Sequence, residues 1–169
     1  MTRLLLAAAL SLLSALALAE PPPLAPEAER ADRIEVLKAD RLLLLYRDGA
    51  EIGRYPVSLG FAPEGDKARE GDGKTPEGAY VIDRKNPKSS FHLSLGVSYP
   101  DAEDRAEAAA RGVSPGGDIF IHGLPNGRGF IGAAHRLRDW TLGCVAVTNS
   151  EIEEIWARVP VGTPIEIRP

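Results

Sequence analysis

Turn signals divide this chain into short strand-like segments, and this pattern constrains its fold more than any other feature. Residues 42–46 and 52–59 are rich in apolar side chains, and Asp48-Gly49 between them is typical of a tight hairpin turn. Ile34 and Val36 precede this hairpin with the alternation of a strand. Further strand-like stretches cover residues 79–83, 91–99, 118–121, 145–147 and 163–167. The pattern predicts a mainly β fold, an antiparallel β-sandwich or barrel-like domain.

Only three segments have the character of helices, and all are short. Residues 101–111 are polar and alanine-rich and stop at Gly112, while residues 130–137 suffice for one or two helical turns. Thr148 and Glu151 form a capping box that begins a helix through residue 159. Trp156 lies on this last helix, and we expect it to pack into the core.

A loop rich in glycine and charge spans residues 64–78 and contains the run Gly71-Asp72-Gly73-Lys74-Thr75-Pro76-Glu77-Gly78. So many glycines and prolines exclude a regular helix or strand. The Lys-Thr pair lacks the spacing of a phosphate-binding loop, and the run leads into a strand instead of a helix. We therefore expect a structural turn that borders a cleft.

The N-terminus has the pattern of an export signal. Arg3 precedes an apolar run, and Ala17-Leu18-Ala19 fits a small-residue cleavage site, so residues 1–19 are predicted to be a signal peptide. The alternative is an uncleaved N-terminal anchor. Residues 20–32 are rich in proline and alanine and predict an extended leader without a role of its own. Residues 33–169 are then one domain, exported to the periplasm or the cell wall.

The charges of the chain argue against nucleic acid as a partner. There are 20 basic and 24 acidic residues, a formal net charge of −4, and the two signs are interspersed. No basic stripe runs along any predicted element, and aromatic residues make up only 6% of the chain. We expect a monomer that does not bind nucleic acid.

Cys144 is the one cysteine of the chain, and it follows Gly143. Exported proteins normally pair their cysteines in disulfides, so a lone thiol is a candidate reactive group. His122 and Gly123 lie upstream at the end of a predicted strand. A histidine can accept the thiol proton, and backbone N–H groups can stabilise an oxyanion. This combination favours a cysteine nucleophile, and the alternative is a buried core thiol.

The other two histidines have simpler interpretations. His92 lies in an apolar stretch and is expected to be a hydrogen-bonded sheet residue, while His135 is expected to be a solvated surface residue. A zinc site built from these histidines, His122 and Cys144 has no ligand spacing in its favour and would block the nucleophile. We therefore expect no metal.

The motifs Ile119-Phe120-Ile121-His122-Gly123 and Thr141-Leu142-Gly143-Cys144-Val145 resemble the signature of the L,D-transpeptidase catalytic-domain family. Residues 71–80, 98–100 and 116–119 also resemble family positions, and the resemblance extends over residues 34–167. It implies a β-sandwich enzyme that remodels peptidoglycan without a cofactor. In such an enzyme the cysteine attacks the carbonyl between the third and fourth residues of a tetrapeptide stem. An amine of a second stem then resolves the thioester and forms a 3-3 cross-link.

By position, the resemblance implies that Cys144 is the nucleophile and His122 the base, oriented by the carbonyl of Gly123. It also implies that the N–H groups of Gly143 and Cys144 are the oxyanion donors. Four further residues are candidates for lining the substrate cleft: Tyr99, Arg138, Trp140 and Thr141.

Two positions depart from the family pattern and leave the acceptor open. Many members have a second histidine where this chain has Leu142, and many have arginine or asparagine where it has Ala146. The acceptor is then an amine, water or a wall-attached lipoprotein. With water the enzyme is a carboxypeptidase or endopeptidase, or a hydrolase that releases bound lipoprotein. The alternative of another class is a non-catalytic wall-binding module.

Overall fold

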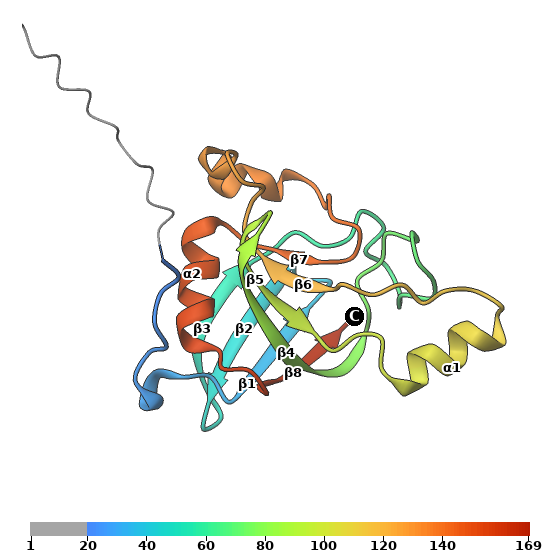
Figure 1. Cartoon of the computed structure of the whole chain (residues 1–169), viewed down its shortest axis with the longest axis horizontal. Helices are drawn as coiled ribbons and strands as arrows, with labels where there is room; N and C mark the ends of the chain where they lie inside the picture. Colours follow the sequence, from blue (N-terminus) through green and yellow to red (C-terminus); the bar gives the residue numbers. More distant parts are fainter. Residues whose placement is uncertain (1–19) are drawn as a thin grey trace, which may run out of the picture.

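One sheet of eight strands organises the domain (Figure 1). The computed structural model describes residues 20–169, so the predicted signal peptide, residues 1–19, lies outside the described residues. The strands follow one another across the sheet in the order β3-β2-β1-β8-β4-β5-β6-β7. Their bounds are β1 Arg33–Leu37, β2 Leu42–Arg47, β3 Ala50–Pro56, β4 Gly78–Ser89, β5 His92–Val97, β6 Phe120–His122, β7 Val145–Ala146 and β8 Pro164–Arg168.

The sheet is mixed and curled. β1 pairs in parallel with β8, and β6 pairs in parallel with β7, while the other neighbours are antiparallel. The chain beyond β3 returns to the β7 edge, where isolated bridges join Ser58 to Ala146 and Gly60 to Thr141. This contact gives partners to backbone groups that an open edge would leave unpaired. The predicted mainly β, barrel-like class is confirmed. The sheet is mixed and not purely antiparallel, because it contains these two parallel pairs.

An apolar core fills the inside of the curl. Ile34 and Val36 of β1 and Leu43 and Leu45 of β2 are fully buried, because alternate residues of a strand point to the same face. Burial of each such side chain stabilises the fold by about 1.5–3 kcal/mol relative to exposure. The same core includes Leu59, Ile82, Leu95, Ile121, Val145, Ile152 and Ile155.

The predicted helices are present. α2 (Asn149–Arg158) begins at the predicted capping box, in which Thr148 N–H donates to Glu151 Oε2 at 2.8 Å. Trp156 is buried in the core, as predicted. α1 spans Ala102–Ala110, and the other helical segments are the 3-10 helices η1 (Glu27–Glu29) and η2 (Gly129–Leu137). No helix within residues 20–169 is long and apolar enough to cross a membrane.

The leader, residues 20–32, runs beside α2 (Figure 1). Ala25 N–H donates to Ala157 O at 2.7 Å, and Ala31 N–H donates to Arg158 O at 2.8 Å. The last carbonyls of a helix have no partners within the helix, so these two contacts satisfy groups that α2 leaves free. The leader therefore has a structural role that its composition did not indicate.

Candidate active site

A cavity of about 960 Å³ opens beside β6 and β7, and His122 of β6 and Cys144, just before β7, both line it. The parallel pairing of β6 with β7 explains why they meet there. Ile121 pairs with Val145 and His122 with Ala146, so Cys144, just before β7, lies beside Phe120 at the start of β6, two residues before His122. The loop before β4 contributes Lys67, Glu70 and Gly71 to another wall. The two motifs of the sequence therefore share one cavity.

His122 is buried at the end of β6, and its Nδ1 atom lies 2.7 Å from the carbonyl oxygen of Gly123. A carbonyl oxygen only accepts, so Nδ1 carries the proton and Nε2 keeps a free lone pair. Burial lowers the pKa of His122, and the hydrogen bond to Gly123 opposes that shift in part. The imidazole is thus neutral near pH 7, in the tautomer that a general base needs.

Aromatic rings enclose the imidazole. The ring centroid of Phe91 lies 4.5 Å from that of His122, and the ring of Trp140 stands edge-on to it at 5.8 Å. These rings exclude water from the imidazole and restrict its rotation about the side-chain bonds. The Gly123 hydrogen bond therefore acts in a largely apolar surrounding, where such a bond is stronger than in water.

Gly123 has no room for a side chain. A β-carbon there would lie 2.8 Å from Asn149 Oδ1 and 3.0 Å from the carbonyl oxygen of Phe91. Asn149 Oδ1 in turn accepts the N–H of Leu124 at 2.9 Å, which fixes the chain just after the His-Gly pair. Sequence reasoning missed Asn149. The only feature of the sequence that pointed to Asn149 is its position directly after the helix cap Thr148, because polar side chains at helix starts often form hydrogen bonds to nearby backbone groups.

The Cys144 side chain is half-buried, and its Sγ atom lies 3.5 Å from the carbonyl oxygen of Asp118. Burial is the main cause that raises the pKa of the Cys144 thiol, and the Asp118 carboxylate adds to it. The Phe120 N–H and the Lys67 ammonium act in the opposite direction. The net direction is upward, so at rest the cavity holds a protonated thiol and a neutral imidazole.

Thr141 shapes the turn that presents Cys144. Its hydroxyl donates to the carbonyl of Cys144 at 2.8 Å and accepts the Gly143 N–H at 3.1 Å. The Gly143 N–H is therefore already engaged, whereas the Cys144 N–H has no acceptor within residues 20–169. Of the two oxyanion donors expected from the sequence, Cys144 N–H is the one that is free.

The four residues expected to line the cleft fall into two groups. Trp140 and Thr141 line the cavity. Tyr99 is buried, and its hydroxyl donates to the carbonyl of Pro115 at 2.8 Å. Arg138 lines a second hollow of about 500 Å³, which shares Trp140 with the first cavity. Neither Tyr99 nor Arg138 is among the residues that line the His122–Cys144 cavity.

The expectations for the other two histidines, His92 and His135, have different outcomes. His92 Nε2 pairs with Glu153 Oε1 of α2 at 2.7 Å, so the expectation of a hydrogen-bonded sheet residue is confirmed. The expectation of a solvated His135 is wrong, because His135 is only 7% exposed. η2 folds over Trp140, and the Trp140 Nε1–H donates to His135 Nδ1 at 3.4 Å. Within residues 20–169, no group of three His, Cys, Asp or Glu side chains is placed to hold a metal ion.

The two departures from the family motif occupy different environments. Leu142 is 73% exposed and lies on the cavity wall, whereas Ala146 is fully buried in β7. The Ala146 N–H and C=O both bond to Ser58. Leu142 is thus the departure that a bound substrate would meet.

Comparison with known proteins identifies the family. Residues 31–167 match the sequence profile of the YkuD family, the L,D-transpeptidase catalytic domain. The chain belongs to this family. A relative, YafK of Escherichia coli (strain K12), is 30% identical over 129 residues, which cover 73% of this chain and 45% of YafK.

Solved structures of other proteins share the fold. Pgp2 of Campylobacter jejuni, a helical cell shape determining protein, superimposes with a TM-score of 0.62 at 26% identity, over 82% of this chain and 47% of Pgp2. Bd1075 of Bdellovibrio bacteriovorus gives a TM-score of 0.56 at 26% identity, over 90% of this chain and 53% of Bd1075. An L,D-transpeptidase from Mycobacterium smegmatis superimposes with a TM-score of 0.55 at 14% identity, over 82% of this chain and 59% of that protein. At this low identity the similarity shows the fold alone. The chain spans about half the length of YafK and Pgp2.

Proposed function

We propose that this L,D-transpeptidase family member is an exported cysteine acyltransferase that remodels peptidoglycan through a thioester on Cys144. The observation that carries the proposal is the shared cavity of His122 and Cys144, with His122 held in the base tautomer by Gly123. Family membership supports a peptidoglycan stem peptide as the substrate. The protein acts as a monomer in the periplasm or at the cell wall.

The first step forms the acyl-enzyme. The Cys144 thiol gives its proton to His122 Nε2, and the sulfur attacks the carbonyl carbon between the third and fourth residues of the stem. The resulting oxyanion accepts a hydrogen bond from the Cys144 N–H. The carbon–nitrogen bond then breaks, and the terminal residue leaves as an amine that takes the proton from His122.

The second step resolves the thioester. An amine of a neighbouring stem attacks the thioester carbon and gives a proton to His122 Nε2. The carbon–sulfur bond breaks, and the sulfur recovers the proton from the imidazolium. A new amide then links two third-position residues, and the enzyme returns to its starting state.

A second candidate keeps the site and changes the acceptor. The exposed Leu142 replaces a polar residue beside the nucleophile turn, so one polar contact for an incoming amine is missing. Water would then resolve the thioester, as in a carboxypeptidase, an endopeptidase or a hydrolase that releases a wall-attached lipoprotein. A non-catalytic wall-binding module of the same fold is the alternative outside enzymology.

Mass spectrometry of muropeptides tests these candidates. Tetrapeptide-rich sacculi are incubated with the wild-type protein and with Cys144→Ala. New 3-3 cross-linked dimers with the wild type alone support the transpeptidase, and shortened or unlinked peptides with the wild type alone support the hydrolase. Identical muropeptides in both samples would refute both enzymatic candidates under these conditions and favour the binding module.

A further inference from the structure

Two buried lysines hold the loop that forms one wall of the cavity, and they differ in one respect. Lys38, which follows β1, is 2% exposed and donates to Gly65 O, Thr75 O and Glu77 Oε1. An ammonium group has three N–H donors, so Lys38 is fully satisfied. Its distances to these acceptors are 2.7, 2.9 and 2.7 Å.

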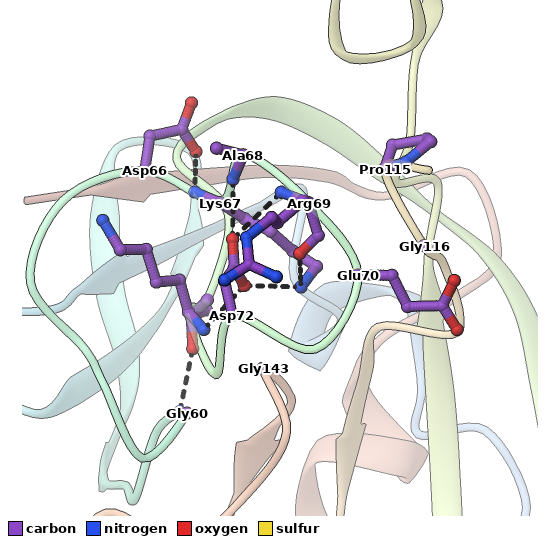
Figure 2. Close-up of polar contacts among 12 residues, drawn as sticks. Gly60, Asp66, Lys67, Ala68, Arg69, Glu70, Asp72, Pro115, Gly116 and Gly143 are labelled. Atoms are coloured by element: carbon purple, nitrogen blue, oxygen red, sulfur yellow. Dashed lines mark hydrogen bonds and ion pairs between the residues drawn. The ribbon is translucent and has the colours of Figure 1, made fainter. Parts of the chain in front are cut away.

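Lys67 is buried to a similar degree but has one donor left over. It is 6% exposed, and its ammonium donates to Asp72 Oδ1 at 2.8 Å and to Arg69 O at 3.1 Å (Figure 2). Within residues 20–169 its third N–H has no acceptor. Native proteins seldom leave a buried donor unused, because such a group costs about 1–3 kcal/mol and more when it is charged.

The Asp72 carboxylate keeps the Lys67 ammonium in place. It also accepts the backbone N–H groups of Ala68, Arg69 and Lys74 at 2.8, 3.0 and 3.1 Å (Figure 2). Together with the Lys67 ion pair, these donors hold the pKa of Asp72 near 2. A carboxylate with this many donors does not move to follow a ligand. The lysine is therefore pre-organised before any substrate arrives.

Lys67 also has a particular place among the charges of the cavity. It is the one lysine or arginine among the described residues that line it, and Glu70 and Asp118 are the two carboxylates. Both carboxylates are on exposed residues, and Asp118 is paired with Arg84 at 3.2 Å. Solvent and this ion pair screen their charges. Lys67 is itself paired with Asp72, but its ammonium lies at a lower effective dielectric and keeps one N–H without an acceptor among the described residues.

From this arrangement we infer that Lys67 is a specificity-determining residue, whose free N–H binds a carboxylate of the donor stem peptide. The inference rests on the proposed function for the identity of the ligand. A stem offers this group from two sources, the terminal carboxylate and a carboxylate on the side chain of the third residue. The chemistry is the same in both cases, a charge-assisted hydrogen bond at the cavity wall.

Equilibrium binding tests the inference without requiring turnover. Isothermal titration calorimetry measures the affinity of Cys144→Ala for three synthetic tetrapeptide stems: one with all carboxylates free, one amidated at its terminus, and one amidated on the third side chain. We expect one of the two amidations to weaken binding by about 10- to 100-fold. The amidation that does so identifies the carboxylate that Lys67 contacts. The same titrations are made after adding Lys67→Met.

Lys67→Met should abolish the preference for the acid over that amide. Lys38→Met, which removes an equally buried lysine and its ion pair, should keep it. If Lys67→Met alone unfolds, the same titrations are made with Lys67→Arg and with the double variant Lys67→Met/Asp72→Asn, which leaves no unpaired charge. Three results overturn the inference: no stem binds, neither amidation weakens binding, or the preference survives Lys67→Met. Binding without turnover by the wild type would instead refute the proposed function and leave Lys67 as a ligand-binding residue.

Discussion

The carbonyl oxygen of Lys74 lies 2.6 Å from the position that a β-carbon on Gly143 would occupy. Gly143 also has φ near +131°, a conformation that other residues rarely adopt. The loop before β4 and the turn before Cys144 are therefore packed backbone against backbone. The glycine of the Gly-Cys motif is required by this packing as well as by access for substrate.

Gly143→Ala should accordingly disrupt the site. We expect a loss of about 2–4 kcal/mol of unfolding free energy and at least a 100-fold lower rate of Cys144 acylation, because the added methyl group clashes with Lys74. Urea unfolding and the acylation rate by a carbapenem measure the two effects. Gly127→Ala is the matched control: it also has positive φ but nothing within 4 Å, so it should cost only about 1–2 kcal/mol. Equal effects of the two variants would show that packing against Lys74 is unimportant.

The resting thiol should be protonated at neutral pH. Burial raises the pKa of Cys144 and lowers that of His122, so both shifts disfavour a thiolate–imidazolium pair. The thiolate absorbance at 240 nm should therefore be absent at pH 7 and develop only at a pH above that at which an ordinary cysteine titrates. Cys144→Ala supplies the baseline. Thiolate absorbance at pH 7 that disappears in this variant would contradict the prediction.

Thr141→Val should slow catalysis more than it destabilises the fold. The substitution keeps the shape of the side chain but removes the hydroxyl that joins Gly143 N–H to the Cys144 carbonyl. We expect a fall in kcat of about 10- to 100-fold with a loss of about 1 kcal/mol in stability. Thr141→Ser retains the hydroxyl and should recover most of the rate. A serine variant as slow as the valine variant would mean that the methyl group, and not the hydroxyl, is needed.

Acid should destabilise the folded protein through His135. Burial lowers its folded pKa to about 4, below the usual value near 6.5. Between these two values the unfolded chain binds a proton that the folded chain does not, so the free energy of unfolding falls as the pH falls from about 6.5 to 4. His122 acts in the same direction.

Urea unfolding at several pH values in this window measures the effect. His135→Gln should reduce the pH dependence by up to about 1.4 kcal/mol per pH unit, which is the limit for one group. Identical slopes for the variant and the wild type would rule out His135 as a contributor.

Local patterns in the sequence were enough to predict much of this protein. The Asp48-Gly49 turn, the Thr148 capping box and the alternation in β1 and β2 each depend on residues a few positions apart, so they could be recognised from the sequence. The same is true of the His-Gly and Gly-Cys pairs, whose spacing led to the family. The class of fold and the two central candidate residues followed from these signals.

Tertiary structure alone decided the features that depend on segments far apart in the chain. The sequence could not show that η2 covers Trp140 and buries His135, or that Tyr99 is not among the residues that line the cavity. It could not show that Lys67 and Lys38, both simply charged residues in the sequence, differ by one N–H that has no acceptor among the described residues. Burial and hydrogen-bond satisfaction are set by what packs around a side chain. The acceptors of Lys38 lie 27 to 39 positions away in the chain, and Ser58 contacts His135 across 77 positions. The acceptors of Lys67 are only two and five positions away, but the loop conformation that brings them together is not fixed by a local pattern in the sequence.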